Sequence, residues 1–337
     1  MRTILRTLAV VAIAGCGGTS TGGGPDSSTG SGDMAGMKPG DMAGMKPADM
    51  AGMMGSGDLA MQQMGFTTVF TIILENNNYA DIIGNMAGAP YINSIASKYG
   101  LATMYYDSGS HPSLPNYLYM ASGDTQYPGG VDCDPTQLCD FVTQFPVDKD
   151  NLGNQLQTHG VAWRSYQESM VTPCKLSASG NYAPKHDPFL YFTDIQKGAN
   201  NLCAQTNVDY GSFAADLAAG TYRYMWITPN LLDDGHNPTN DPAQGLKQAD
   251  TWLSTELPKI LASPTYQAGG VVFITWDEAE DGTGHIPMIV ISPRGKPSYQ
   301  ATAKYDHASF LATVEDIFGF PRLGKAATAQ TMMEFFQ

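Results

Sequence analysis

Short apolar runs that alternate with amphipathic helical stretches are the feature that most restricts how this chain can fold. The runs are rich in β-branched and aromatic residues, which is typical of buried strands, and they lie at 67–74, 160–166, 222–228, 271–275 and 286–292. Apolar residues at helical spacing occupy 90–100, 243–263 and 306–319, and Gly100 is expected to end the first of these helices. The alternation predicts an α/β fold, with a mostly parallel central sheet and helices on both faces. In such sheets, ligands bind beyond the carboxyl ends of the strands.

The N-terminal segment lacks this pattern. In residues 1–16, Arg2 and Arg6 precede a short apolar stretch that ends in small residues, which is typical of a secretory signal peptide. The last four residues, IAGC, resemble the lipobox of bacterial lipoproteins, in which the cysteine, here Cys16, becomes lipid-modified. The alternative is a plain signal peptide with an incidental cysteine. We therefore expect an exported protein, lipid-anchored to the bacterial cell envelope and facing the periplasm or the cell surface, or otherwise secreted.

Residues 17–65 are interpreted as a linker. The sequence DMAGMKP occurs at 33–39 and again at 41–47, and DMAGM follows at 49–53. A glycine-rich repeat without β-branched residues cannot bury a core, so we expect a disordered tether. Its methionines would suit Cu(I), but no His or Cys accompanies them, which favours the tether. The catalytic domain is then expected to span residues 66–337.

Four cysteines follow the export signal, and an even number in this context predicts two disulfides. Proximity along the chain favours Cys133 with Cys139 and Cys174 with Cys203, although sequence alone does not establish the connectivity. A zinc site is the weaker interpretation, because these spacings match no common zinc pattern.

The formal net charge of −14 restricts the partners of the protein. General nucleic-acid binding needs a basic surface, so we expect no nucleic-acid partner. An anionic substrate would need a bound cation to reverse the local field.

Polar residues follow three of the predicted strands, at the point where each strand ends. Glu75 and Asn76 follow the first strand, His236 ends the segment PNLLDDGH after the third, and Asp277 and Glu278 follow the fourth. Carboxylate and amide oxygens are hard ligands that suit Mg²⁺, Ca²⁺ or Mn²⁺. The alternative for each piece is a solvated loop or turn.

The segment HPSLPNYLYMASG, residues 111–123, predicts the start of a helix. Pro115 suits the first turn of a helix and disfavours helical geometry at Leu114, so the helix should begin near Ser113. The free N–H groups and the dipole at a helix N-terminus favour an anion. Ser113 is therefore either a hydroxyl that faces an anion or an ordinary N-cap, and this stretch alone leaves both open.

A set of segments in one order carries a resemblance to a known family. They are LENNNYADIIG, HPSLPNYLYMASG, AWRSYQESM with YAPKHDPF, TPNLLDDGH, TWDEAEDGTGHIPMIVISP and YDHASFLATVEDIFGFP. Together they resemble the bacterial phosphoesterase family of acid phosphatases and phospholipases C, in the alkaline phosphatase superfamily. The resemblance covers about residues 66–325 and is nearer to the compact acid phosphatase-like members.

The resemblance implies an alkaline phosphatase-like fold and a metal-dependent phosphomonoesterase. It implies that Ser113 is the nucleophile, that a phosphoseryl intermediate forms, and that water then hydrolyses it. The metal ligands that it implies are Glu75, Asn76, Asp277 and Glu278. The metal would lower the pKa of the hydroxyl and, with the helix N–H groups, stabilise charge at phosphorus.

The histidines in the matching segments receive different roles. By resemblance, His186 and His236 lie around the phosphate, where they would protonate the leaving group and donate hydrogen bonds. His307 would support the metal ligands or the carboxylates from behind. The roles of His111, Asn116 and His285 stay open.

The sequence also departs from the family pattern in two places. The segment ENNNYADIIG lacks the Ser-Phe-Asp-His run that some members carry, and AEDGTG stands where some relatives have His-Gly-Gly. These departures leave open the adjacent substrate wall and any fifth ligand or second metal.

Two other functions remain open from the sequence. A phospholipase C would use the same chemistry on a phosphodiester, and four aromatic residues that could form a choline cage are Trp163, Tyr166, Trp226 and Trp276. These residues are equally interpreted as core. The second alternative is a surface binding protein that has lost catalysis. The expected substrate is a phosphate ester, with membrane contact only through the N-terminal lipid; the sequence determines neither the oligomeric state nor the metal.

Overall fold

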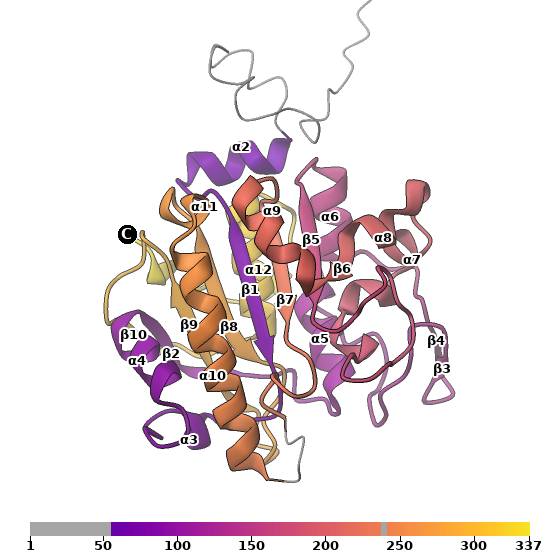
Figure 1. Cartoon of the computed structure of the whole chain (residues 1–337). Coiled ribbons are helices and arrows are strands. Elements are labelled where there is room, and N and C mark those ends of the chain that lie inside the picture. The colour runs from indigo at the N-terminus through magenta and orange to yellow at the C-terminus, as the bar shows by residue number, and fades with distance from the viewer. Residues whose placement is uncertain (1–54, 237–240) are drawn as a thin grey trace, which may run out of the picture.

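The apolar runs form the strands of one sheet in the computed structural model, which describes residues 55–236 and 241–337. The sheet has nine strands in the order β10-β2-β9-β8-β1-β7-β5-β6, with β11 beside β2 (Figure 1). The signal peptide, Cys16 and residues 17–54 of the predicted linker lie outside the described residues. The strands are β1 (Val69–Leu74), β2 (Gly100–Tyr106), β5 (Trp163–Gln167), β6 (Asn207–Asp209), β7 (Tyr224–Thr228), β8 (Val271–Trp276), β9 (His285–Ile291), β10 (Gln300–Ala301) and β11 (Tyr305–Asp306), and a separate hairpin consists of β3 (Leu138–Cys139) and β4 (Thr143–Gln144).

The sheet is mostly parallel, as predicted. Strands β8, β1, β7, β5 and β6 all run parallel to one another. β9 is antiparallel to both β8 and β2, because the connection of residues 277–284 is too short for a crossover over the sheet. β1 therefore lies at the centre, where all six of its residues are buried.

Helices cover both faces of this sheet. In Figure 1, α10 crosses the front face and α12 lies behind the sheet; α10 packs against α4, and α12 packs against α5 and α2. No helix of the described residues is long and apolar enough to cross a membrane. The helices are α2 (Ser56–Gln63), α3 (Tyr79–Ile82), α4 (Pro90–Lys98), α5 (Ser113–Ser122), α6 (Leu152–Thr158), α7 (Thr193–Gln196), α8 (Leu202–Thr206), α9 (Phe213–Ala219), α10 (Pro242–Leu261), α11 (Pro264–Gln267) and α12 (His307–Phe318).

Helix α2 corrects the predicted linker boundary, because it lies inside residues 17–65. Met61 and Phe66 are 1% and 2% exposed and belong to the core. Gly57 fits closely at the helix start, where a Cβ atom would lie 2.6 Å from Val161 and 2.8 Å from Phe320. The composition of this segment resembles that of the repeat before it, so only its packing reveals that the folded domain begins about ten residues earlier.

Strand β2 corrects the interpretation of Gly100. Helix α4 already ends at Lys98, and Gly100 is the first residue of β2, which pairs with β9. A Cβ atom at this position would lie 2.4 Å from the ring of Phe335, so the glycine permits close packing rather than a helix cap.

Both predicted disulfides are confirmed. Cys133 is bonded to Cys139 with their Cα atoms 5.7 Å apart, and Cys174 is bonded to Cys203 with their Cα atoms 5.4 Å apart. The first disulfide ties the segment before β3 to the end of that strand, and the second ties the segment after β5 to α8.

Candidate active site

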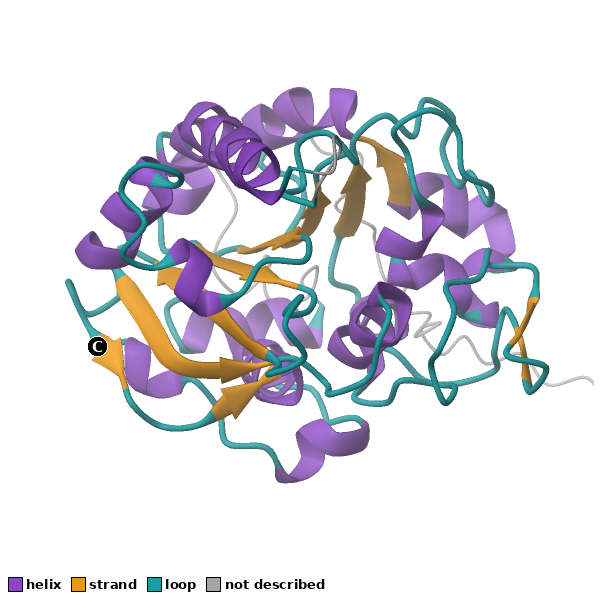
Figure 2. Cartoon of the chain, turned by 90° about the horizontal axis from the view of Figure 1, so that it is seen from below, coloured by secondary structure: helices purple, strands orange, loops and turns teal. Residues whose placement is uncertain are grey.

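The parallel strands end at one edge of the sheet, which Figure 2 shows from below. Glu75 follows β1, Asp277 and Glu278 follow β8, and Asp234 and His236 lie in the loop after β7. Parallel strands bring their carboxyl ends to the same edge, so residues from distant parts of the sequence meet here.

Glu75 is the centre of this group, and its side chain is fully buried. Ser113 Oγ donates a hydrogen bond to Glu75 Oε2 at 3.0 Å, and the Tyr117 hydroxyl donates to Oε1 at 2.6 Å. His186 Nε2 lies 3.2 Å from Oε1, and His236 Nδ1 lies 4.0 Å from Oε2. Burial raises the pKa of Glu75, and Lys185, the hydroxyls and His236 oppose that rise.

The N-cap interpretation of Ser113 is wrong. The N-cap of α5 is Pro112, whose side chain makes no capping hydrogen bond. Ser113 is the first helical residue, 1% exposed, and its hydroxyl points to Glu75 instead. The serine therefore lies at the helix start with its oxygen directed toward the group of carboxylates.

The second acidic pair lies beside the first. The backbone N–H of Asn76 donates to Asp277 Oδ1 at 3.1 Å, and its side-chain amide donates to Glu278 Oε1 at 3.1 Å. Glu278 Oε2 also contacts His111 Nδ1 at 2.5 Å and accepts from Asn116 Nδ2 at 3.2 Å. These bonds join three of the predicted metal ligands, Asn76, Asp277 and Glu278, and give His111 and Asn116 a common partner.

Buried polar atoms without a hydrogen-bond partner gather in this cluster. They include Asn76 Oδ1, Asp277 Oδ2, Asp234 Oδ2 and His186 Nε2. Burial raises the pKa of Asp277 and of Asp234 well above the ordinary value, and the charge on Glu75 adds to both shifts. Desolvated acceptors that lack a donor are costly, so this arrangement favours a positively charged ligand.

The donor atoms of the predicted ligands decide whether the site suits a divalent metal ion. Within the described ranges, no three His, Cys, Asp or Glu side chains are grouped so that they alone would hold a metal ion. The three carboxylates of the predicted set, on Glu75, Asp277 and Glu278, therefore do not form such a group by themselves, and the set depends on the amide oxygen of Asn76 as a further donor. Asn76 Oδ1 and Asp277 Oδ2 are both buried and unpartnered, and these hard oxygens suit Mg²⁺, Ca²⁺ or Mn²⁺. The residues present therefore fit such an ion.

His186 and His236 lie in different surroundings. Burial lowers the pKa of His186 well below the ordinary value, Lys185 and His236 lower it further, and its ring stacks on Tyr117 at 5.2 Å. The side chain of His236 is 42% exposed and lies at the opening of the group. These two histidines thus share one neighbour, Glu75, but differ in access to solvent.

Two other predicted residues lie outside the immediate group. His307 Nε2 is 2.6 Å from the backbone carbonyl of Asp277, and its Nδ1 is 2.9 Å from the Tyr105 hydroxyl. His285 stacks on Tyr79 and its Nε2 lies 2.9 Å from the carbonyl of Thr103. His307 thus lies directly behind a carboxylate, whereas the ring of His285 is engaged at the edge of the sheet. The four aromatic residues considered for a choline cage are buried in the core: Trp163, Tyr166, Trp226 and Trp276.

Lys185 is a site residue that sequence reasoning missed, although it stands in the segment YAPKHDPF. Its Nζ atom lies 3.4 Å from Ser113 Oγ and forms a salt bridge of 2.6 Å with Asp132. Burial alone would lower the pKa of Lys185, but Glu75 and Asp132 outweigh it and raise the pKa. The residue therefore supplies a permanent positive charge beside the serine.

Tyr117 and Asp234 were also missed. Tyr117 follows Ser113 by one helical turn, in the segment HPSLPNYLYMASG, where its apolar ring fits an ordinary core position. Asp234 belongs to the segment DDGH, in which only the histidine was singled out. The helical spacing of Ser113 and Tyr117 was a usable signal, because residues four apart lie on the same helix face.

Comparison with known proteins gives consistent results. The sequence profile of the Phosphoesterase family matches residues 86–321. A phosphatidylinositol-3-phosphatase of Mycobacterium tuberculosis is 27% identical, and the match covers 80% of this chain and 83% of that protein. An acid phosphatase of Aspergillus fumigatus is 26% identical over 81% of this chain and 60% of its own length, so the chain spans under two thirds of that relative.

A solved structure shares the fold. It is a protein of the alkaline phosphatase superfamily from Vibrio parahaemolyticus, with a TM-score of 0.55 and 10% identity, matched over 80% of this chain and 72% of that one. At this identity the similarity concerns the fold alone, and it agrees with the mixed, mostly parallel sheet.

Proposed function

Since the chain belongs to the Phosphoesterase family and is a phosphoesterase hydrolase, we propose that it acts as a phosphomonoesterase with Ser113 as its nucleophile. The observation that carries this proposal is the buried hydrogen bond from Ser113 Oγ to Glu75 Oε2 at the start of α5. A hydroxyl that donates to a carboxylate is oriented with its lone pairs free for attack.

The residues around Ser113 support an in-line transfer of a phosphoryl group. Ser113 Oγ attacks phosphorus while its proton moves toward Glu75 Oε2, the oxygen to which it is already bonded. Lys185 Nζ and the N-terminal N–H groups of α5 offset the negative charge on the phosphate oxygens. Tyr117 holds Glu75 from the other side, so the carboxylate keeps its orientation.

Four residues would hold the divalent cation that the donor chemistry fits: Glu75, Asn76, Asp277 and Glu278. When bound, such a cation would lower the pKa of the serine hydroxyl and neutralise charge on the phosphate.

His236 and His186 have different roles in this proposal. His236 lies at the solvent-exposed side of the group, where a leaving alcohol would depart, so it is the candidate for protonating that alcohol. His186 is buried against Tyr117, and its Nε2 lies 3.2 Å from Glu75 Oε1 without a hydrogen bond, so it is the candidate for a hydrogen bond to a phosphate oxygen. Water then hydrolyses the phosphoseryl intermediate.

Two variants test the proposal together. Ser113→Ala should reduce turnover of p-nitrophenyl phosphate by at least about 10³-fold and leave the metal content and the melting temperature near those of the wild type. Asp277→Asn should lose bound metal as well as rate, because a charged hard ligand becomes neutral. Metal analysis of the purified variants therefore separates the two effects, and vanadate should inhibit the wild type.

A serine at the far end of the same helix provides the control. Ser122 Oγ bonds the carbonyl of Leu118, away from the carboxylates, so Ser122→Ala should change turnover by no more than about twofold. If Ser113→Ala retains more than about a tenth of wild-type turnover, Ser113 is not the nucleophile and a bound water takes its place.

A further inference from the structure

Asp132 contacts the helix N–H and the lysine that we assign to the phosphate. Its Oδ1 accepts a hydrogen bond from the backbone N–H of Leu114 at 3.0 Å, in the first turn of α5. Its Oδ2 forms the 2.6 Å salt bridge with Lys185, the residue whose Nζ also lies 3.4 Å from Ser113 Oγ. One carboxylate thus contacts both a helix N–H and the lysine that we assign to the phosphate.

The backbone on both sides of Asp132 is held in place. The Tyr127 hydroxyl donates to the carbonyl of Val131 at 2.7 Å, and the Tyr191 hydroxyl donates to the carbonyl of Cys133 at 2.5 Å. The disulfide links Cys133, the residue after Asp132, to Cys139 in β3. The carboxylate is therefore a fixed feature of the site, and a phosphate on Ser113 must share these donors with it.

A fixed negative charge beside the phosphate site favours phosphate groups that carry less negative charge. A phosphate monoester releases its second proton with a pKa of about 6, so it is singly charged in acid and doubly charged above neutrality. Repulsion from a nearby carboxylate grows with the charge on the ligand. The singly charged form therefore loses less binding free energy than the doubly charged form.

We propose that Asp132 is a specificity-determining residue that makes the site select singly charged phosphate groups, namely monoesters in their acidic form and diesters. The proposal rests on the proposed function, because it takes Ser113 and Lys185 as the place where the phosphate binds. It assigns the preference to one side chain outside the carboxylate cluster of Glu75 and Asp277.

Of the groups that face Asp132, only Lys185 offsets its charge, and a phosphate that binds Lys185 must compete with Asp132 for that cation. Lys185 is its ion-pair partner and has its own pKa raised, so it stays positive. Tyr127 and Tyr191 are neutral phenols, and the charge on Asp132 helps to raise the pKa of both, after the effect of burial. Asp134, on the same loop, is negative and also acts on Tyr191.

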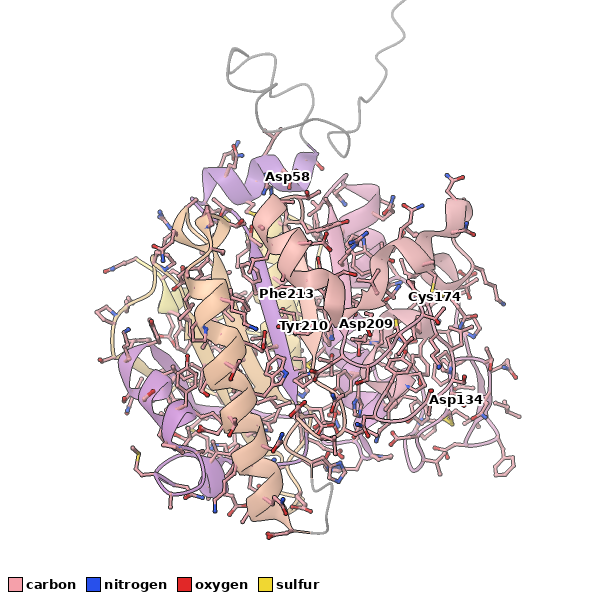
Figure 3. The ribbon with its side chains drawn as sticks, viewed as in Figure 1. Asp58, Asp134, Cys174, Asp209, Tyr210 and Phe213 are labelled. Atoms are coloured by element: carbon pink, nitrogen blue, oxygen red, sulfur yellow. A yellow bond between two sulfur atoms is a disulfide. The ribbon has the colours of Figure 1, made fainter. Side chains whose placement is uncertain are left out.

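Direct binding of inorganic phosphate tests the proposal without relying on turnover. Calorimetry on the full chain with divalent cation supplied would compare the wild type, Asp132→Asn and Asp134→Asn at about pH 5 and about pH 8, on either side of the second phosphate pKa. Asparagine keeps an acceptor for the Leu114 N–H and removes only the charge. Asp134→Asn is the matched control, because it removes the same charge from the same loop; Figure 3 labels Asp134.

We expect Asp132→Asn to tighten phosphate binding by at least about tenfold at the higher pH and by no more than about threefold at the lower pH. The alkaline limb of the kcat/KM profile should move to higher pH, whereas Asp134→Asn should resemble the wild type in both measurements. Unaltered melting temperatures would show that the variants fold, and Asp132→Ser serves as a second variant.

Four results would overturn the proposal. Weaker binding by Asp132→Asn at both pH values would mean that Asp132 only anchors Lys185. Equal tightening at both pH values, or the same effect from Asp134→Asn, would mean that general charge is responsible. Failure of the wild type to hydrolyse phosphate esters would count against the proposed function, whereas binding of phosphate that ignores Asp132 would count against this inference alone.

Discussion

Asp187 shows at the residue scale how a buried carboxyl group next to the site affects stability. Its side chain is fully buried, Oδ1 accepts from Ser165 Oγ at 3.0 Å, and Oδ2 has no partner. Burial raises the pKa of Asp187 to about 8. The folded chain thus keeps a proton that the unfolded chain releases near pH 4, and stability that is full below about pH 4 falls as the pH rises to about 8.

Asp187→Asn should remove this part of the pH dependence. The neutral amide keeps the bond from Ser165 and carries no charge to desolvate, so the variant should gain stability relative to the wild type as the pH rises from about 4 to about 8. Urea unfolding across that range measures the difference. Asp148→Asn, at an exposed position, is the control and should show no such trend. A constant difference between Asp187→Asn and the wild type would contradict the explanation.

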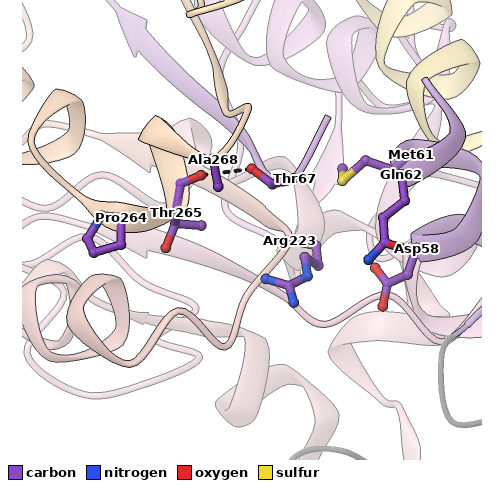
Figure 4. Close-up of a pocket in the computed structure, with 8 residues that line it drawn as sticks. All are labelled: Asp58, Met61, Gln62, Thr67, Arg223, Pro264, Thr265 and Ala268. Atoms are coloured by element: carbon purple, nitrogen blue, oxygen red, sulfur yellow. Dashed lines mark hydrogen bonds between the residues drawn. The ribbon is translucent and has the colours of Figure 1, made fainter. Parts of the chain in front are cut away.

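At the scale of elements, α2 joins the N-terminal segment to the core. The helix packs against α12, and Phe66, just after it, contacts the Phe336 ring edge-on at 4.9 Å between centroids. A cavity of about 320 Å³ beside α2 is lined by residues that include Asp58, Thr67 and Arg223 (Figure 4). This end of the sheet is opposite the carboxyl ends of the strands, so α2 contributes to stability and not to the site.

Met61→Ala should destabilise the chain by about 2–4 kcal/mol, because it leaves a cavity where a buried side chain was. Gln63→Ala, on the exposed side of α2, should cost less than about 0.5 kcal/mol. Equal stability of Met61→Ala and the wild type would restore the original linker boundary at residue 65.

Deletion of residues 17–54 should change turnover by no more than about twofold, since their composition cannot form a core.

On the scale of the whole molecule, the disulfides tie loops of different length. The Cys174–Cys203 link spans 29 residues and the Cys133–Cys139 link spans six. Closing a longer loop removes more conformational entropy from the unfolded chain. Replacing Cys174 and Cys203 by serine should therefore cost about 3–4 kcal/mol, and replacing the other pair about 2 kcal/mol.

Urea unfolding of the two double variants, compared at a single pH, measures this ordering. A larger loss from the short loop would show that folded-state contacts of the β3–β4 hairpin, rather than loop entropy, dominate its contribution.

The architecture and part of the site could be predicted from the sequence alone. Apolar runs and helical periodicity report local burial, so they predicted the strands β1, β7 and β8 and the helices α10 and α12. Because parallel strands end at one edge, the positions of Glu75 and Asp277 after two such strands predicted that they would meet. The family resemblance added Ser113 and the histidines to this group, and the Ser113→Ala variant tests the role of the serine.

Only the tertiary structure decided which side chains surround the serine. Lys185 and Asp132 are 53 residues apart in the sequence, and their salt bridge follows from the packing of one loop on the start of α5. Likewise, α2 and β2 lack a clear local pattern and are fixed by what they pack against. Periodicity encodes how much of a residue is buried, whereas the partner of a buried polar atom depends on contacts between distant segments, which no local pattern specifies.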